Sequence, residues 1–143
     1  RPDKMILAAL VETLRLHCSG LAFSDIPVLH RLAMPQAEVQ ERAEALSRRL
    51  QAGGVPPECL ELRPGFCRVG GGSSPSGQLP TTLVCLDPRG TGADRLAARL
   101  RTGVPAVVGR IADDHFLLDL RGIAPEEDEL LAEAVLVALE REE

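Results

Sequence analysis

The 143-residue sequence has almost no aromatic side chains: it contains no Trp, no Tyr and three Phe. Modules that bind single-stranded nucleic acid stack the bases on aromatic rings. The formal net charge of −5 points the same way, because phosphate backbones bind basic surfaces. The scarcity of aromatic side chains and the negative net charge both argue against a nucleic-acid-binding module built from this chain alone.

Membrane spans, secretion signals and metal motifs are also missing from the sequence. No apolar run approaches the roughly 18 residues that a membrane span needs, and the N-terminus lacks a signal-peptide pattern. The three His are scattered, and the spacing of the four Cys matches no zinc or redox motif. We therefore expect no membrane contact, no metal site and a cytoplasmic protein with buried, reduced thiols at Cys18, Cys59, Cys67 and Cys85.

The first residues read Arg-Pro-Asp-Lys, without a Met, and run directly into a helical pattern. A natural N-terminus usually carries a few disposable residues before its first packed element. We therefore expect this chain to be a piece of a longer polypeptide.

Four segments have the periodicity of helices. We predict helices over residues 3–17, 35–51 and 91 or 92–101, and from residue 125 onward. Pro35 and Pro125 open two of them, since Pro fits the first helical turn. Residues 21–34 are expected to be irregular, apart from a short turn at 28–32.

Shorter segments are β-branched or alternate between apolar and polar residues, as half-buried strands do. We predict strands over residues 59–63, 66–69, 81–86, 104–111 and 115–121. The last two flank Asp113-Asp114, which predicts a tight turn and an antiparallel hairpin. Helices and hairpins in this order predict an α+β fold, with a small antiparallel sheet covered by helices on one face.

A glycine-rich stretch, VGGGSSPSGQLPT, occupies residues 69–81. It fails as a Walker phosphate loop because Gln78-Leu79 stand where Lys and Ser/Thr are required, and as a dinucleotide fingerprint because no helix follows. We predict a connection between two strands of one domain. Loops of this length in compact domains are often functional, so the candidate site residues are Gly70, Gly71, Gly72 and Ser73.

Charged residues near the C-terminus carry further hypotheses. Asp119 and Arg121 lie two apart on a predicted strand and so share a face, where a structural ion pair is expected. Arg110 could approach that end of the sheet or face solvent, and both alternatives stay open. The acidic run at 126–129 is expected to be a solvated helix start, whose charge suits the helix dipole, and not an acid/base pair.

Six segments of the chain resemble, in the same order, the blocks of one enzyme family. They are RPDKMILAALVETLRLH, IPVLHRL, ERAEALSRRL, VGGGSSPSGQLPT, VVGRI and LLDLRGIAPEEDELLAEA. The family is bacterial selenocysteine synthase, L-seryl-tRNA(Sec) selenium transferase, and the similarity spans essentially the whole chain. The resemblance implies a C-terminal fragment of a fold-type-I pyridoxal-phosphate (PLP) enzyme. It also implies an inter-domain helix over residues 1–20 and a small C-terminal α+β domain over residues 21–143.

The same resemblance implies a transferase that converts seryl-tRNA(Sec) to selenocysteinyl-tRNA(Sec) with selenophosphate. PLP acts in such enzymes as an electron sink. Lys4 is the only lysine of the chain and does not match the family's cofactor-lysine motif, so the fragment is expected to bind no PLP and to be inactive alone. The full-length enzyme is expected to be a homo-oligomer that binds PLP, tRNA and selenophosphate, and in it this chain contacts the large PLP domain.

Individual residues also gain expected roles from the resemblance. Arg1 matches one of two family arginines implicated in binding the anionic selenium donor, and a guanidinium suits that role because it forks onto phosphate oxygens. Arg121 is a candidate for another anion contact. The loop residues 70–73 are expected to face the large domain near the active site. No catalytic residue, cofactor lysine or metal ligand is expected in the chain itself.

Two other functions fit the same residues. One is the C-terminal domain of a related PLP-dependent lyase that acts on small amino acids or sugar-acid phosphates. The other is a non-enzymatic interaction domain. The upstream sequence discriminates among the three, because a tRNA enzyme needs a basic N-terminal domain ahead of its cofactor lysine.

Overall fold

The computed structural model describes residues 1–69 and 77–140. The chain divides into two compact units, Arg1–Pro35 and Gln36–Glu143. Residues 21–35 therefore group with the first helix and not with the sheet-forming part of the chain. No helix in the described ranges is long and apolar enough to cross a membrane.

The N-terminal unit consists of three helices: α1 (Lys4–Cys18), α2 (Ala22–Asp25) and α3 (Pro27–Ala33). The predicted first helix is confirmed, and the Asp3 carboxylate caps it by accepting a hydrogen bond from the Met5 amide N–H at 3.1 Å. The prediction of irregular structure over 21–34 is wrong. Pro27 occupies the first turn of α3, where its missing N–H has no helical partner to lose.

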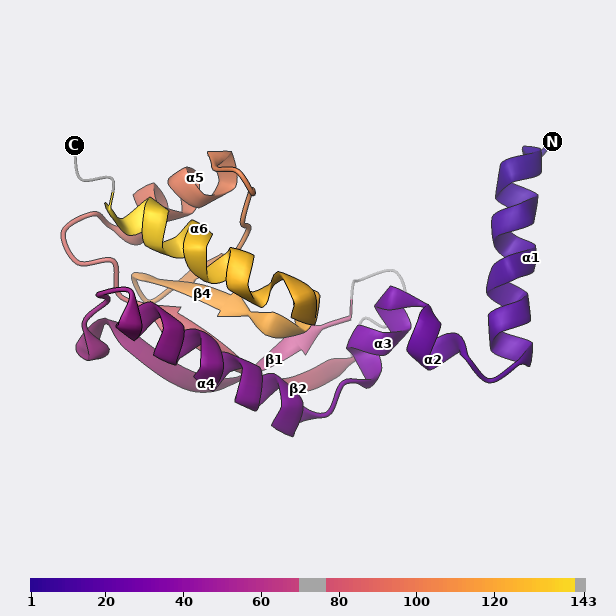
Figure 1. Ribbon diagram of the computed structural model, residues 1–143, viewed down its shortest axis with the longest axis horizontal. Helices are drawn as coiled ribbons and strands as arrows, with labels where there is room; N and C mark the ends of the chain where they lie inside the picture. The colour runs from indigo at the N-terminus through magenta and orange to yellow at the C-terminus, as the bar shows by residue number, and fades with distance from the viewer. Residues whose placement is uncertain (70–76, 141–143) are drawn as a thin grey trace. The chain divides into compact units, whose positions relative to one another are not determined.

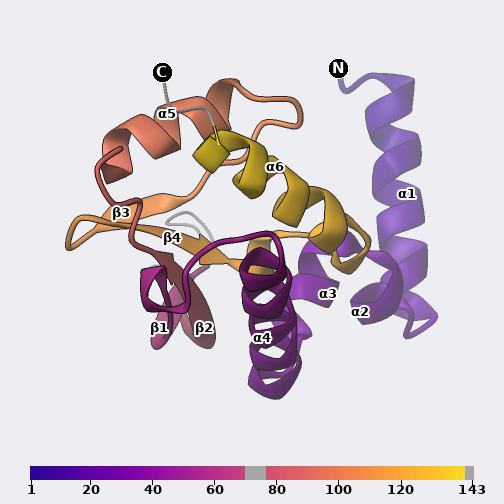
Figure 2. The same ribbon diagram turned by 60° about the vertical axis from the view of Figure 1, so that its left-hand side comes forward.

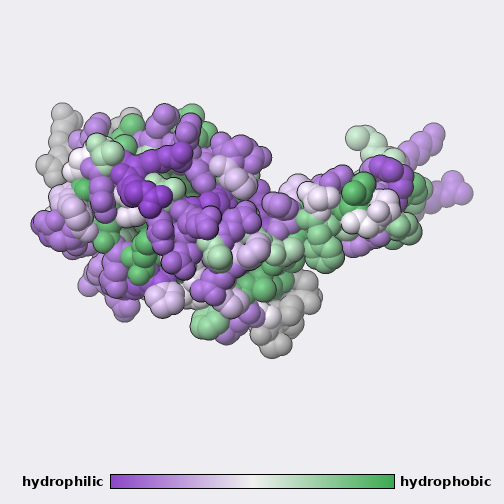
Figure 3. All heavy atoms as spheres, turned by 60° about the horizontal axis from the view of Figure 1, so that its bottom comes forward, coloured by the Kyte–Doolittle hydropathy of each residue, from purple (hydrophilic) through white to green (hydrophobic). Residues whose placement is uncertain are grey.

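Helix α1 buries none of its side chains. Leu7, Leu10, Val11 and Leu14 recur at helical spacing on one face, and they are 46–64% exposed. Figure 3 shows hydrophobic side chains at the surface of this unit. Exposed apolar stripes of this kind are typical of surfaces that contact another molecule or another part of a longer chain.

The C-terminal unit is built on a four-stranded antiparallel sheet (Figure 1). Its strands are β1 (Leu60–Arg68), β2 (Gln78–Leu86), β3 (Arg110–Ala112) and β4 (His115–Asp119), in the spatial order β1-β2-β4-β3. β1 pairs with β2 along its whole length, whereas β4 pairs with β2 only from Leu83 to Leu86. Residues 64–68 and 78–82 therefore form a two-stranded extension, which we call the β1–β2 arm.

Three helices, α4 (Gln36–Ala52), α5 (Ala93–Thr102) and α6 (Asp128–Glu140), cover one face of this sheet (Figures 1 and 2). Strand alternation sends Val84, Leu86, Phe116 and Leu118 to this face, where each is at most 1% exposed. They pack against apolar side chains of the helices, namely Ala43, Leu46, Leu50, Leu96, Leu100, Leu131, Val135 and Ala138. The predicted α+β class with one helix-covered face is confirmed.

Four strand predictions need correction. The two short strands predicted over 59–63 and 66–69 are one continuous strand, β1, which tolerates Pro64 because it lies at the sheet edge. The strand predicted over 104–111 is reduced to β3, because Pro105 has no N–H to donate to a ladder. The strand predicted over 115–121 ends at Asp119, and the chain continues as a 3-10 turn, η2 (Leu120–Gly122). Two further 3-10 turns are η1 (Pro57–Cys59) and η3 (Pro125–Glu127).

The predicted hairpin between β3 and β4 is confirmed. Asp113 and Asp114 have φ angles of 51° and 60°, a left-handed region that Asp tolerates better than most residues. Gly109 lies just before this hairpin and passes close to β4. A Cβ atom at Gly109 would lie 2.6 Å from the Leu117 carbonyl oxygen, so no other residue fits there without a shift of the backbone.

A largely buried ion pair joins α4 to the start of α6. Arg42 Nη2 lies 2.6 Å from Asp128 Oδ1, and Arg42 Nε donates to Asp128 Oδ2 at 2.9 Å. The same guanidinium donates to the carbonyl oxygens of Leu120 and Ile123, each at 3.0 Å. The side chains of Arg42 and Asp128 are only 10% and 14% exposed. The guanidinium therefore supplies the donors that these acceptors cannot obtain from bulk water.

Candidate functional site

The face of the sheet opposite the helices carries a small apolar cluster with a polar network beside it. Leu83, Cys85 and Leu117 point to this face by strand alternation and are at most 8% exposed. The polar network lies next to them, at the base of the β1–β2 arm. Thr81 contributes to it from β2 and Asp119 from the end of β4.

Asp119 is the centre of this network. Its Oδ1 atom accepts hydrogen bonds from the Thr81 hydroxyl at 2.7 Å and from the Arg121 backbone N–H at 3.1 Å. Arg121 Nη2 donates to the Pro80 carbonyl oxygen at 2.8 Å, and Arg121 is only 4% exposed. These hydrogen bonds link η2 to the base of the β1–β2 arm.

Arg110 completes the network from β3. Its Nη2 atom lies 3.8 Å from Asp119 Oδ2, and its side chain is 52% exposed, against 16% for Asp119. Of the two alternatives that the sequence left open, the approach of Arg110 to this end of the sheet is therefore confirmed. Two guanidinium groups and one carboxylate give the network an excess of positive charge, which suits an anion.

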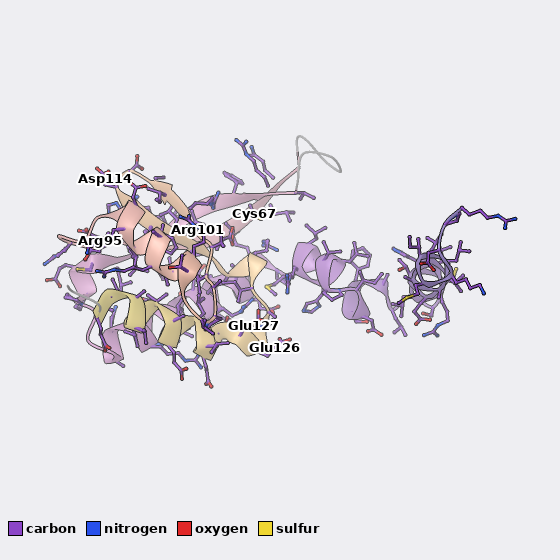
Figure 4. The ribbon with its side chains drawn as sticks, turned by 90° about the horizontal axis from the view of Figure 1, so that it is seen from above. Cys67, Arg95, Arg101, Asp114, Glu126 and Glu127 are labelled. Atoms are coloured by element: carbon purple, nitrogen blue, oxygen red, sulfur yellow. The ribbon has the colours of Figure 1, made fainter. Side chains whose placement is uncertain are left out.

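Cys67 lies on the arm at this end of the sheet (Figure 4). Burial raises the pKa of its thiol and the Asp119 carboxylate raises it further, while Arg121 and Arg110 act in the opposite direction. The raised pKa keeps the thiol protonated at neutral pH, and only a thiolate is a strong nucleophile. The arginines of the network therefore suit it to binding an anion, and the protonated Cys67 thiol is a poor nucleophile.

The acidic residues 126–129 have structural partners. Glu127 Oε2 accepts a hydrogen bond from the Ala124 N–H at 3.3 Å, and Glu129 pairs with Arg49 at 3.1 Å. Figure 4 shows Glu126 and Glu127 near one another in η3, just before α6, and both are exposed as expected. The expectation of a solvated helix start is wrong for Asp128, because its side chain is only 14% exposed and pairs with Arg42.

The other predicted site residues belong to different parts of the chain. Arg1 is exposed in the N-terminal unit, two residues before the helix cap Asp3, whereas Arg121 belongs to the C-terminal unit. Lys4 is exposed on the first turn of α1. The glycine-rich candidates, residues 70–73, lie outside the described ranges, so their role stays a prediction.

The cysteines only partly follow the expectation of buried thiols. All four are free; Cys59 and Cys85 are buried, Cys67 is half-buried, and Cys18 is exposed on α1, so the prediction is wrong for Cys18. Within residues 1–69 and 77–140, no group of three or more His, Cys, Asp or Glu side chains is arranged to hold a metal ion.

Sequence reasoning missed two of the residues that build the site. Thr81 and Pro80 contact partners that are 38 and 41 residues away in sequence. The pattern along one strand shows which residues share a face, but not which residue of the next strand stands opposite. The pairing of β2 with β4 supplies that information.

The C-terminal unit is thus a small α+β unit that presents Arg110 and Arg121 at one end of its sheet. Comparison with known proteins identifies the family. The sequence model described as L-seryl-tRNA selenium transferase matches residues 1–124. The chain belongs to this family.

Individual relatives carry the same name. The chain is 40% identical over 143 residues to the L-seryl-tRNA(Sec) selenium transferase of Desulfovibrio desulfuricans, covering 97% of this chain and 30% of the relative. It is 38% identical over 136 residues to that of Geobacter metallireducens, covering 94% of this chain and 29% of the relative. The enzyme of Carboxydothermus hydrogenoformans is 38% identical over 127 residues, with 89% and 27% coverage. The chain therefore spans about 30% of the length of these relatives.

Proposed function

We propose that this chain is the C-terminal domain of a PLP-dependent selenium transferase that converts seryl-tRNA(Sec) to selenocysteinyl-tRNA(Sec) with selenophosphate. The observation that carries the proposal is the similarity of 97% of the chain to relatives of that name, of which it represents 30%. On this proposal the sheet-forming unit is the small domain of a fold-type-I PLP enzyme in the cytoplasm. Residues 1–20 then form the helix that joins it to the large domain.

The described residues of this chain do not fit the cofactor. PLP, when bound to such an enzyme, supplies an electron sink at the reacting amino acid. A lysine that holds PLP is activated by a desolvated pocket or a neighbouring cation. The single lysine, Lys4, is instead exposed on a helix whose side chains are all accessible. We therefore assign PLP to the large domain and no chemical step to this chain.

The chain's own contribution is binding and support. The apolar stripe of α1 is suited to pack against the large domain, because Leu7, Leu10, Val11 and Leu14 have no cover in their own helix. The arginine network is suited to bind an anionic group of the selenium donor or of the tRNA, because the Arg110 side chain is 52% exposed and lies 3.8 Å from Asp119. Arg1 is proposed as a second contact to the donor, in the N-terminal unit.

The test compares substrates on the full-length enzyme. With selenophosphate, it should form selenocysteinyl-tRNA from seryl-tRNA(Sec) and leave free L-serine unchanged, and the isolated 143-residue chain should do neither. Turnover of free amino acids without turnover of seryl-tRNA would instead establish the lyase. Activity of the isolated chain would refute the assignment of PLP to another domain.

The anion contact is tested in the same assay. Arg110→Ala should raise the KM for one anionic substrate by roughly tenfold, the amount expected for loss of one charged hydrogen bond. Arg48→Ala, which removes an arginine that is 69% exposed on α4, serves as the control and should leave KM unchanged. Equal effects of the two substitutions would show that the network is not a binding site.

A further inference from the structure

The C-terminal unit exposes one aromatic side chain. Of the two Phe in this unit, Phe116 lies in the core with 0% of its surface exposed, whereas Phe66 on the β1–β2 arm is 57% exposed. Strand alternation sends Phe66 to the same side of the arm as Pro64 and Arg68, because every second residue of a strand shares a face. The ring is therefore available to a binding partner.

The residues around this ring form a small continuous surface. Phe66 stands opposite Pro80 in the ladder, and the next pair on the same side is Arg68 with Gln78. Paired residues have Cβ atoms about 4.5–5.5 Å apart, and same-face neighbours along a strand are about 6.6 Å apart. We call this surface the arm face; its members, Pro64, Phe66, Arg68, Gln78 and Pro80, are all exposed.

The arm face carries positive charge and no negative charge. Arg68 is the only charged residue between positions 64 and 82, although charged residues make up 26% of the chain. None of the ion pairs within residues 1–69 and 77–140 includes Arg68. An anion that approaches the ring therefore meets a guanidinium group and no carboxylate of the arm.

This combination of side chains has the chemistry that binds an unpaired nucleotide. Proteins bind single-stranded RNA by stacking its bases on aromatic rings, by hydrogen bonds to the base edges and by positive charge along the phosphates. The arm face offers a ring for the base, the Gln78 carboxamide for a base edge and the Arg68 guanidinium for a phosphate. The net charge of the chain is −5, so such a contact adds to RNA binding by the rest of the enzyme and does not replace it.

We propose that the arm face holds an unpaired nucleotide at the 3′ end of the tRNA substrate, with the base stacked on Phe66 and the phosphate bound by Arg68. This inference rests on the proposed function, which makes seryl-tRNA(Sec) the substrate. The 3′ end carries the serine, so a contact to it orients the reacting group. Phe66 is thereby a positioning residue. The Thr81–Asp119 hydrogen bond lies on the opposite side of the arm and leaves the arm face accessible.

Kinetics of the full-length enzyme test the stacking. Phe66→Ala should raise the KM for seryl-tRNA(Sec) about tenfold, the loss expected for one stacked base, and leave the KM for selenophosphate unchanged. Phe66→Trp should keep the KM close to wild type because it retains a ring. Phe66→Leu should resemble Phe66→Ala because it keeps apolar contact without a ring. The control Phe23→Ala removes a Phe that is 61% exposed in the N-terminal unit and should change neither KM.

Binding of two tRNA(Sec) transcripts, with and without the unpaired 3′ nucleotides, locates the contact. Phe66→Ala should weaken binding of the intact transcript about tenfold and leave binding of the shortened one unchanged. Arg68→Ala should reduce the slope of log affinity against log salt concentration by about 0.7 for the intact transcript, as loss of one phosphate contact to a single strand does.

Three results overturn the proposal. They are equal losses for the two transcripts, a wild-type KM for Phe66→Ala, and a Phe66→Leu enzyme that outperforms Phe66→Trp, which would show an apolar contact to another protein domain. Each of them leaves the proposed function standing, because the enzyme still converts seryl-tRNA(Sec). A wild-type enzyme that binds neither transcript refutes both the contact and the proposed function.

Discussion

The buried pair of Arg42 and Asp128 offers the sharpest test of what holds the C-terminal unit together. Arg42→Ala removes at least four hydrogen bonds: two to the Asp128 carboxylate and one each to the carbonyl oxygens of Leu120 and Ile123. The carboxylate, 14% exposed, is left without its cation. Breaking a buried ion pair on one side costs about 3–5 kcal/mol. We expect the free energy of unfolding to fall by that amount.

The chain supplies a matched control in the same pair of helices. Arg49 on α4 pairs with Glu129 on α6 at 3.1 Å, but these side chains are 43% and 81% exposed. Arg49→Ala should therefore cost only about 0–1 kcal/mol, as exposed ion pairs do. Both substitutions remove an arginine from α4 and a contact to the first turn of α6. The difference between them isolates burial.

Urea unfolding followed by far-ultraviolet circular dichroism measures both variants. Intrinsic fluorescence is unsuitable because the chain has neither Trp nor Tyr. Equal losses of stability for Arg42→Ala and Arg49→Ala would refute the reasoning, since burial would then make no difference. Arg42→Lys should recover little of the loss, because an ammonium group cannot reach four acceptors from one position as the planar guanidinium does.

Three further predictions follow from single sites. Gly109→Ala should lower the free energy of unfolding by about 1–3 kcal/mol, because the added carbon would overlap backbone atoms. At Gly122 an added carbon meets no atom within 4 Å, so Gly122→Ala should change the free energy of unfolding by less than about 0.5 kcal/mol. Urea unfolding that ranks the two variants in reverse would contradict this. Cys67 has a raised pKa, so its iodoacetamide labelling should rise with pH only above the range in which free cysteine reacts, and mass spectrometry that finds Cys67 labelled as readily as free cysteine at neutral pH would exclude the shift. Thr81→Val should cost about 1–2 kcal/mol by leaving a carboxylate oxygen with one donor fewer, and a thermal melt unchanged from wild type would show that the bond contributes nothing.

Elements with a strong local signal were predictable from the sequence. The helix that begins after Asp3, the helix opened by Pro35 and the Asp-Asp hairpin depend on caps, Pro and turn residues that act within a few positions. The strand predicted over 104–111 was not, because Pro105 has no N–H to donate to a ladder and Val104 and Val108 lie exposed at the surface. A run of valines has the same appearance in a strand and at an exposed surface.

The candidate site was only partly visible for a different physical reason. Arg121 and Arg110 could be selected as charged residues near the end of a strand, but their common partner Asp119 and the Thr81 hydroxyl meet only through the register of β2 and β4. Burial also decides the role of a charge. Asp128 is one of four consecutive acidic residues, and the sequence does not distinguish the one that is covered by Arg42.

The β1–β2 arm has a mechanical consequence. Among the described residues, no third strand pairs with β1 or β2 over 64–68 and 78–82. The Thr81–Asp119 and Arg121–Pro80 hydrogen bonds link the base of the arm to the rest of the unit. A two-stranded ribbon bends and twists more easily than a wider sheet. The two hydrogen bonds at the base therefore help to set the direction in which the arm points. Losing them should change where the arm points and how fast its amide protons exchange, while the amides of residues 83–86 keep their protection.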